Sequence, residues 1–554
     1  MPLFTLSILE IAVLNFQIIT YIYQIRILDM RKLLFLLLAG IAISLTSCRN
    51  DFAFEPSTGG LEFSKDTVYL DTVFTNIGSS TYTLKVYNRS NKDISIPKIQ
   101  LGKGLNSKYR IMVDGMTGDA GAQGKIFSNV ELLAKDSLFI FVEVTSDVAS
   151  ANPTDFLYTD QIQFSNITGG PQTVELVTLI QDAYFIFPHR TQNADNTFTY
   201  EGINLGTDDT NQPVTIVGST LDHNDPINQD EYIWKNDKPY VVYGYALVPD
   251  NETLIVTSGA RVHFHANSGL IIAKNGTLKI NGLPSATNDP EDLSKEVIFE
   301  GDRLEPDYSD VPGQWSAIIN FSTLSNNVIE HLTLKNASVG ILSNNLALTT
   351  DNSFTKFTIK DSQIYNCSNY GILGRTAQIT ADNLVVNNSG QANVAATYGG
   401  TYNFSNCTFN NNWNSSKQAA VILNDYLETD TAYLVKPTTI AMTNCIVYGS
   451  NSTEISLEKK GTSFATTFFN CLFKVNDLSS ALIANPLYDS IRLEQNGNKK
   501  NINPKFKNID KNQMWPTEDL FAKVAPAAAS LFDILNKPRN STNTNIGAYQ
   551  FIAN

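Results

Sequence analysis

A pattern repeated six times between residues 329 and 473 constrains the fold of this chain more than any other feature of its sequence. Three Asn-Cys pairs mark it most clearly, in SNCTF (405–409), TNCIV (443–447) and FNCLF (469–473). When the repeats are aligned on these pairs, the position before the cysteine holds His331, Asp361, Asp382, Asn406, Asn444 and Asn470. Asn and Asp are the non-glycine residues that best tolerate a left-handed backbone. The column therefore predicts a sharp corner at the same place in every repeat.

The columns on either side of this corner have the alternation of strands. The first position after the corner holds Leu332, Ser362, Asn383, Cys407, Cys445 and Cys471. Two residues later all six positions are apolar: Leu334, Ile364, Val385, Phe409, Val447 and Phe473. Before the corner, five of six are apolar in the column Ile329, Ile359, Thr380, Phe404, Met442 and Phe468. A strand that buries one face requires this period of two. The pattern thus predicts a stack of coils, each containing a strand, a corner and a second strand.

This arrangement resembles the right-handed parallel β-helix repeat family, which has the pectate-lyase-like fold. The stretch ETLIVTSGARVHFHANSGLIIAKNGTLKINGL (252–283) fits its opening coils, so we expect the β-helix over 251–500. NPKF (503–506), VAPAAASLFD (524–533) and NIGAYQF (545–551) resemble the closing signature of bacterial surface β-helices. The resemblance implies that Gly547, Ala548 and Tyr549 seat the last strand within a closing segment over 501–554.

An earlier unit, over 61–182, also alternates with period two. Its short runs, such as DSLFIFVEV (136–144), are broken by Asn, Gly and Ser, as in an antiparallel sandwich. The order of these signals resembles the ASPM/SPD-2/Hydin-type immunoglobulin-like family, whose members serve as interaction or spacer modules. The expected fold class is therefore all-β, an N-terminal Ig-like β-sandwich followed by a right-handed parallel β-helix. Residues 183–250 are irregular and polar, and we expect them to form a linker and a cap on the β-helix.

The N-terminal region carries a targeting signal. From Met30 the chain reads MRKLLFLLLAGIAISLTSC, in which a basic start precedes an apolar run too short to span a bilayer, so 30–47 is predicted to be a signal peptide. LTSC (45–48) resembles a bacterial lipobox, which implies acylation of Cys48, a tether over 48–60 and membrane attachment through the lipid. An ordinary anchor or a chance cysteine are the alternatives. Residues 1–29 are either an over-extended start or an additional membrane helix.

The same resemblance implies a location in the cell envelope. Arg49 gives no reason for inner-membrane retention, so an outer-membrane lipoprotein is expected, on either leaflet. Sites such as DTV (66–68) resemble those that Bacteroidetes glycosylate. The net charge of −14 and the lack of a Lys/Arg cluster exclude a nucleic-acid partner.

The remaining cysteines and histidines are candidates for chemical sites. The chain has no C-x-x-C pair, so no metal is expected, and the cysteines of the repeats are predicted to be buried core residues. A disulfide between adjacent coils is the alternative. His263 and His265 alternate with apolar Val262 and Phe264, so both histidines are expected to face solvent.

The best candidate for binding is the coil region 370–433, which is rich in aromatic residues. They are Tyr370, Tyr398, Tyr402, Trp413, Tyr426 and Tyr433. An insertion, LNDYLETDTAYLVKP (423–437), adds Asp425, Glu428 and Asp430. Aromatic faces flanked by carboxylates can stack on a sugar ring and bond its hydroxyls. Scaffold or loop anchoring is the alternative role for these tyrosines.

Three functions follow from these features. Of the motifs typical of polygalacturonase-like enzymes only Asp208-Asp209 occurs, outside the expected coils. We therefore expect a non-enzymatic carbohydrate-binding or adhesion protein that recognises a polysaccharide or cell-surface glycan and needs no cofactor. The alternative is a polysaccharide lyase or glycoside hydrolase that acts on acidic polysaccharide through Asp425, Glu428 and Asp430, with Ca²⁺ only in the lyase case. The third function is that of a structural envelope protein.

Overall fold

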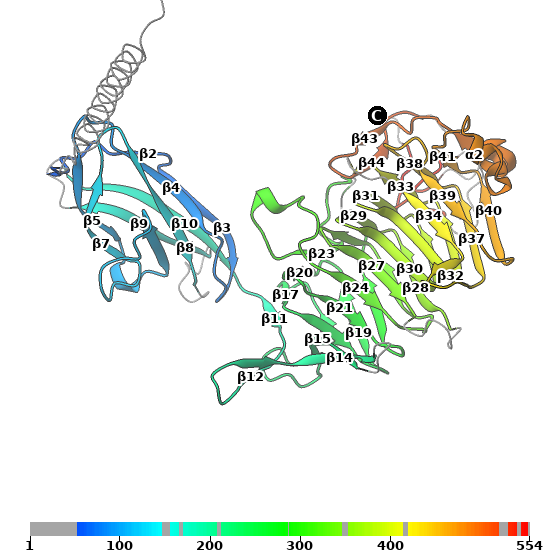
Figure 1. The fold of residues 1–554 in the computed structure, drawn as a ribbon, viewed down its shortest axis with the longest axis horizontal. Coiled ribbons are helices and arrows are strands. Elements are labelled where there is room, and N and C mark those ends of the chain that lie inside the picture. The colour runs from blue at the N-terminus through cyan, green and yellow to red at the C-terminus, as the bar shows by residue number, and fades with distance from the viewer. Residues whose placement is uncertain are drawn as a thin grey trace, which may run out of the picture. The chain divides into compact units, whose positions relative to one another are not determined.

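The computed structural model describes residues 53–146, 156–165, 170–207, 212–285, 287, 289–345, 353–413, 419–519, 530–539 and 544–551. Cys48 and the predicted signal peptide lie outside these residues. The prediction of an all-β chain is confirmed (Figure 1). The chain forms two compact units. The first is built mainly from Thr81–Val142 and Asp160–Glu175, and the second consists mainly of the residues from Leu176 onward. None of the helices in the described part of the chain is both long and apolar enough to cross a membrane.

The first unit is a sandwich of two sheets. One sheet has the order β1 (Glu55–Pro56), β5 (Ile94–Leu101), β9 (Leu157–Ser165), β10 (Gln172–Gln181) and β3 (Thr67–Phe74), with β7 (Ile126–Leu132) also paired to β5. The other has the order β2 (Glu62–Phe63), β4 (Tyr82–Tyr87), β8 (Ser137–Val144) and β6 (Tyr109–Val113). Alternate residues such as Leu84, Val86, Leu138 and Ile140 are buried between the sheets, because successive side chains of a strand point to opposite faces.

The second unit is a coil stack, in which the chain visits three parallel ladders of strands in turn. Face 1 contains β11 (Tyr184–Ile186), β17 (Tyr240–Val242), β20 (Arg261–Phe264), β23 (Val297–Gly301), β26 (Leu332–Lys335), β29 (Gln363–Cys367), β31 (Val385–Ser389), β33 (Thr408–Asn411), β38 (Ile446–Gly449), β41 (Leu472–Phe473) and β42 (Lys499–Lys500). The strands of successive coils lie side by side (Figure 1).

The other two ladders share two long strands. Face 2 contains β15 (Pro213–Thr220), β18 (Tyr245–Val248), β21 (Gly269–Ile272), β24 (Ala317–Asn320), β27 (Val339–Asn344), the first halves of β30 (Tyr370–Asp382) and β32 (Ala392–Ser405), β34 (Val421–Asn424) and β39 (Ile455–Glu458). Face 3 contains β16 (Ile233–Trp234), β19 (Thr253–Thr257), β22 (Thr277–Asn281), β25 (Val328–Glu330), β28 (Thr355–Lys360), the second halves of β30 and β32, β37 (Thr438–Thr443) and β40 (Phe464–Phe469). The ladders begin at β11 and β15, within the segment expected to be a linker and cap.

The corner between face 3 and face 1 has a left-handed backbone in each of the six repeats. The φ angles are 48° at His331, 48° at Asp361, 50° at Asn383, 49° at Asn406, 56° at Asn444 and 53° at Asn470. One predicted position is therefore wrong, because Asp382 is the last residue of β30 and the corner residue is Asn383. The predicted columns shift by one residue in this coil. The register places Ala381 beside Ile359, and fully buried Leu384 takes the place predicted for Asn383.

The position after the corner provides a hydrogen-bond acceptor inside the stack. The amide of Leu332 donates to Oγ of Ser362 at 3.1 Å, and that of Cys407 donates to Sγ of Cys445 at 3.4 Å. Cys445 in turn donates to Sγ of Cys471 at 3.4 Å. A buried amide without a hydrogen-bond acceptor lowers the stability of the folded state, and these hydroxyl and thiol groups supply the acceptor. The four described cysteines are buried and free, as core residues would be.

The closing segment packs against the outside of face 1. The amide of Gly547 donates to the carbonyl of Asn444 at 2.8 Å, and that of Ala548 donates to Oγ1 of Thr408 at 3.1 Å. Tyr549 is buried with Met514 and Val385. The expectation that residues 547–549 seat the last strand is therefore wrong, because they lie across strands in the interior of the ladder, where they cover its outward apolar side chains.

Candidate functional site

A continuous column of outward side chains runs along face 2. Its nine members are in register from one coil to the next: Thr220, Leu247, Ile271, Ile319, Leu342, Leu373, Ala395, Ile422 and Ser456. They alternate with buried residues such as Ile341 and Val421, so the column faces away from the core. Leu247, Ile319, Leu342 and Ile422 are half-buried, whereas Ile271, Leu373 and Ala395 are buried at 1%, 9% and 2% exposure. Eight steps of a β ladder extend about 38 Å, so the column is a long and mainly aliphatic ridge that is open to solvent along part of its length.

Face 3 does not share this character. Its corresponding outward column begins with Ile233 and Ile255 but continues with Lys279, Val328, Thr358, Thr380, Asn403, Ala441 and Thr467. Most of these side chains are polar or small, as expected for a surface that only meets water. Face 1 carries the closing segment. Face 2 is therefore the ladder whose outward surface is mainly aliphatic and does not carry the described part of the closing segment.

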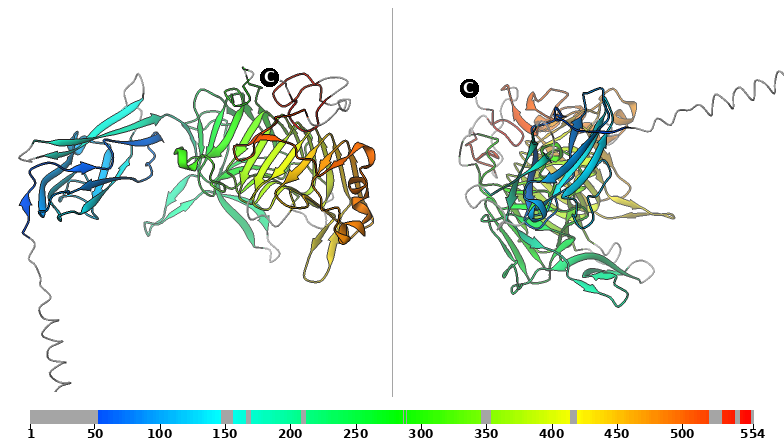
Figure 2. Two further views of the ribbon diagram at one scale, coloured as in Figure 1. Left: turned by 90° about the horizontal axis from the view of Figure 1, so that it is seen from above. Right: turned by 90° about the vertical axis from the view of Figure 1, so that its left-hand side faces the viewer.

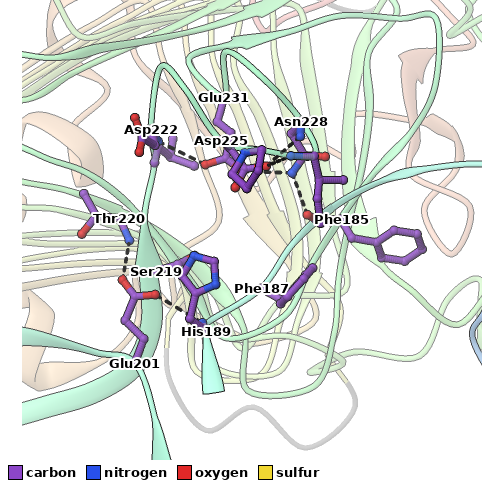
Figure 3. Close-up of a pocket in the computed structure, with 13 residues that line it drawn as sticks. Phe185, Phe187, His189, Glu201, Ser219, Thr220, Asp222, Asp225, Asn228 and Glu231 are labelled. Carbon is purple, nitrogen blue, oxygen red and sulfur yellow. Dashed lines mark hydrogen bonds between the residues drawn. The ribbon is translucent and has the colours of Figure 1, made fainter. Parts of the chain in front are cut away.

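A pocket of about 590 Å³ lies at the N-terminal end of this column. Thr220 belongs to both the column and the pocket wall. Phe185 and Phe187 line one side, together with His189 and the loop that holds Asn228 (Figure 3). The side chain of Phe187 is 44% exposed, so an aromatic face is open to a ligand. We call this the N-terminal pocket.

Carboxylates surround the N-terminal pocket, and the chain itself holds each of them. Glu201 accepts from the amides of His189 at 3.2 Å and Thr220 at 3.4 Å (Figure 3). Asp225 accepts from the amide of Asn228 at 2.7 Å. Glu231 accepts from the amide of Asp222 at 3.1 Å and from Nδ2 of Asn228 at 2.9 Å, and burial raises its pKa. These bonds fix the acidic groups in place and leave them as acceptors for hydroxyl groups.

A second pocket, of about 530 Å³, lies at the other end of the column and is called the C-terminal pocket. Ile422 and Ser456 of the column line it, with Leu482 of α2 (Ser480–Ile483) and Tyr488. The hydroxyl of Tyr488 accepts from the amide of Leu457 at 2.8 Å, which ties this wall to β39. The aliphatic column therefore connects two concave sites.

A hairpin of β35 (Tyr426–Glu428) and β36 (Tyr433–Val435) projects from the coil stack (Figure 2). Tyr426 and Tyr433 meet edge to face at 5.2 Å, and Nζ of Lys460 lies 4.5 Å from the Tyr433 ring centre. Tyr426 donates to Glu458 of that pocket at 2.5 Å, a bond that raises the pKa of Tyr426 to about 12. Tyr433 donates to Glu428 at 3.1 Å. These contacts hold the hairpin in place next to Glu458 of the C-terminal pocket.

The remaining residues predicted for this site are separated in the structure. Tyr402 and Asp425 are completely buried, and Tyr398 is 3% exposed. Asp425 accepts from the amides of Lys460 at 2.7 Å and Gly461 at 2.8 Å, so it is a loop anchor. The six aromatic residues therefore do not form one surface, and Asp425 is not available for acid–base chemistry.

The other predicted residues lie at separate places. Tyr370 is half-buried at the start of β30, and Trp413 is half-buried just after β33. Asp430 is exposed in the turn of the β35–β36 hairpin. Glu428 keeps an exposed carboxylate beside Tyr433. Only Tyr426, Tyr433 and Glu428 of the predicted set come together.

The two histidines differ from each other, contrary to expectation. His265 is exposed and lies 2.7 Å from the carboxylate of Asp302, as a surface residue can. His263 is buried at 5% exposure, with Nδ1 3.3 Å from the carbonyl of Gly301, so its predicted solvent exposure is wrong. Among the residues that the structure describes, no three His, Cys, Asp or Glu side chains gather as metal ligands would.

The sequence patterns did not indicate the N-terminal pocket. Its walls come from three separate segments, 185–189, 201 and 219–231, which share no motif spacing. The run DHNDPINQDE (222–231) was the available signal, since such a dense polar run marks an ordered loop. The sequence did not indicate the aliphatic column either, because the outward and inward residues of face 2 are both apolar and do not alternate in polarity.

Comparisons with known proteins give little further guidance. No family model and no curated protein matches the chain. Among solved structures, PapD-like domain 7 of human CEP192 is 12% identical with a TM-score of 0.15, and the match covers 25% of this chain and 95% of that one. The Agl-KA catalytic domain is 11% identical with a TM-score of 0.21, and the match covers 77% of this chain and 86% of that one. The catalytic unit of a GH87 alpha-1,3-glucanase from Streptomyces thermodiastaticus is 12% identical with a TM-score of 0.21, and the match covers 70% of this chain and 83% of that one. TM-scores this low carry no argument about fold or activity.

Proposed function

We propose that this chain is a carbohydrate-binding protein of the bacterial cell envelope and that an extended glycan lies along face 2. In this proposal the coil stack is a right-handed parallel β-helix and the first unit is an Ig-like domain. The observation that carries the proposal is the register of the outward column, which begins in the N-terminal pocket at Thr220 and ends in the C-terminal pocket at Ile422 and Ser456. The apolar faces of sugar rings pack well on aliphatic and aromatic surfaces.

The charge of the N-terminal pocket indicates the kind of glycan. Glu201, Asp222, Asp225 and Glu231 line it, and Lys and Arg are absent from its described lining residues. A uronate would be repelled there, whereas the hydroxyls of a neutral or amino sugar can donate to carboxylate oxygens. We therefore propose a neutral or amino-sugar polymer as the ligand of face 2.

Binding without turnover is the favoured activity. A carboxylate that acts as a general acid or base needs an oxygen within reach of the reacting group. In the predicted site, Asp425 is buried, and both of its oxygens accept from backbone amides. It therefore cannot reach a substrate, which supports a binding role over a hydrolase or lyase that uses Asp425.

Attachment to the outer membrane through acylated Cys48 remains part of the proposal. Its support is the basic start, short apolar run and LTSC sequence of residues 30–48. Labelling with radioactive palmitate in cells tests it. Wild-type protein should be labelled and the Cys48→Ser variant should not, whereas labelling of that variant would contradict the anchor.

A glycan array combined with a product assay tests the binding function. The secreted chain from residue 53 onward should bind neutral or amino-sugar polymers and release no reducing sugar or unsaturated uronate. The Phe187→Ala variant should bind about tenfold more weakly, because it loses the open aromatic face of the pocket. Phe198→Ala is the matched control, since Phe198 is 45% exposed on the hairpin of β12 (Arg190–Gln192) and β13 (Phe198–Tyr200) and does not line the pocket. Product release, or equal binding by both variants, would contradict the proposal.

A further inference from the structure

The two sheets of the sandwich present different outward surfaces. On the four-stranded sheet, Phe139 and Phe141 of β8 are 39% and 36% exposed, and Met112 of neighbouring β6 is 40% exposed. The other sheet presents glutamines, such as Gln100, which donates to Gln163 at 3.2 Å, and its exposed Tyr69 and Leu179 lie on the separate strands β3 and β10. Large apolar side chains that gather on a surface mark an interaction site.

The exposed aromatic rings are ordered by their neighbours. Phe139 and Phe141 stand on the same side of β8, their ring centres are 6.2 Å apart and their planes differ by 14°. Lys85 of β4 lies directly across the ladder from Phe139, with Nζ 4.6 Å from the ring centre. Beside it, the guanidinium carbon of Arg89 lies 4.3 Å from the ring centre of Tyr87. We call these five residues the sandwich platform.

The charge of the platform is opposite to that of the whole chain. The chain carries a net charge of −14, yet the platform contains Lys85 and Arg89. Arg110 is exposed on the adjoining strand β6, between inward-facing Tyr109 and Ile111. Two acidic residues lie beside these cations. Glu62 is 2.8 Å from Nε of Arg89, and Glu143 follows Phe141 on the outward side of β8. Local positive charge on an acidic protein favours an anionic partner.

We propose that the sandwich platform binds an anionic polysaccharide. Sugar rings stack on Phe139 and Phe141, and the carboxylate or sulfate groups of the polymer meet Lys85, Arg89 and Arg110. Two near-parallel aromatic rings on one strand can each pack against the apolar face of a sugar ring, and a polysaccharide repeats such rings along its chain, which a lipid headgroup does not. The site lies on a different unit from face 2, takes a ligand of different charge and does not depend on the proposed function of the coil stack.

Binding to immobilised polygalacturonate tests the proposal, with uncharged dextran as the reference and the secreted chain from residue 53 as the protein. Polygalacturonate should bind, and its affinity should fall as salt is added. The double variant Phe139→Ala/Phe141→Ala should bind about tenfold more weakly, because two ring contacts are lost. Phe139→Tyr/Phe141→Tyr should retain binding, which separates ring loss from misfolding. Tyr69→Ala is the matched control, since Tyr69 is 69% exposed on the other sheet.

Three results would overturn the platform. They are unchanged binding by the double alanine variant, equal binding of dextran and polygalacturonate, and binding to phosphatidylglycerol vesicles without binding to polygalacturonate. If Phe187→Ala bound neutral glycans as well as the parent, the proposal for face 2 would fail, but the polygalacturonate measurements on the sandwich platform would not change. The failure of one site is therefore distinguishable from the failure of the other. Lys85→Gln/Arg110→Gln should both weaken binding and reduce its dependence on salt.

Discussion

The amide of Cys445 donates a hydrogen bond to Sγ of Cys471, one coil further along the stack, at 3.4 Å. The same thiol donates to the carbonyl of Phe469 at 3.4 Å. Ser362 behaves in the same way in its coil, since Oγ accepts from Leu332 and donates to the carbonyl of Lys360 at 2.6 Å. At Ser362, Cys445 and Cys471 the residue after the corner therefore joins two neighbouring coils through its side chain, whereas Leu332 and Leu384 at the same position only fill the core. This explains why sulfur or oxygen occupies a position inside the core.

Replacing Cys471 by valine should destabilise the coil stack more than replacing it by serine. Valine fills similar space but leaves the buried amide of Cys445 without an acceptor, at a cost of about 1–3 kcal/mol. Serine keeps an acceptor. All four tryptophans of the chain lie beyond residue 183, so tryptophan fluorescence during urea unfolding reports on this unit. A valine variant as stable as the serine variant would show that the thiol is only filler.

The corner at Asn444 should tolerate glycine better than alanine. Its backbone is left-handed, with φ at 56°, which costs alanine about 1–2 kcal/mol and glycine almost nothing. Its side-chain amide has no hydrogen-bond partner among the described residues, so its removal should cost little. The urea midpoints of Asn444→Gly and Asn444→Ala provide the measurement. Equal midpoints would contradict a role for backbone conformation at this corner.

Stability of the coil stack should decrease as the pH rises towards neutrality. Burial raises the pKa of Asp361 from 3.8 to about 7 and that of Glu296 from 4.5 to about 7. At these two carboxyl groups the folded state therefore binds more protons than the unfolded state between pH 4 and pH 7, and their contribution to stability is highest at the acidic end of this window and falls as the pH rises through it. His331 opposes them, because burial lowers its pKa from 6.5 to about 4, so the test compares the parent with a variant that removes Asp361 alone. Urea midpoints at pH 5 and pH 8 measure the loss.

The Asp361→Asn variant provides the control for this pH dependence. Asparagine fits the left-handed corner, where φ is 48°, and cannot lose a proton. The variant should be more stable than the parent at pH 8 and should show a smaller difference between pH 5 and pH 8. An unchanged pH profile would mean that Asp361 does not titrate in this range.

A polar substitution in the outward column of face 2 should weaken glycan binding without unfolding the protein. Leu342→Gln adds a polar group at the centre of the column, where a sugar ring would lose its apolar contact. Val328→Gln is the matched control, because Val328 is also half-buried and faces outward on face 3 of an adjoining coil. Isothermal titration with the polymer identified on the array measures both. Equal losses would remove the distinction between the two faces.

The sequence predicts the coils well because corner and core residues leave a periodic signal. The slip at Asp382 arises from two adjacent residues, Asp382 and Asn383, that are both acceptable at a left-handed corner. Thr380 was the polar exception in its column, and moving the register by one residue replaces it with Ala381. The requirement for apolar residues in the core therefore favours Asn383 over Asp382 as the corner residue.

The candidate site was predicted less well, for a physical reason. Tyr402 and Asp425 look like binding residues by type, but burial decides their role, and burial depends on contacts between coils that are distant in sequence. The N-terminal pocket needs Phe187, Glu201 and Thr220 from three segments, whose proximity no local pattern encodes. Glu428 and the hairpin tyrosines were found because they lie close together in sequence.

The dependence of affinity on glycan length tests the central claim most directly. A series of oligosaccharides of the polymer that binds best should be titrated into the secreted chain. If the glycan lies along face 2, the affinity should rise with each added sugar until the oligosaccharide extends about 38 Å, the length of the column from Thr220 to Ser456. An affinity that reaches its limit with a disaccharide would contradict the account, because it would show binding in a single pocket.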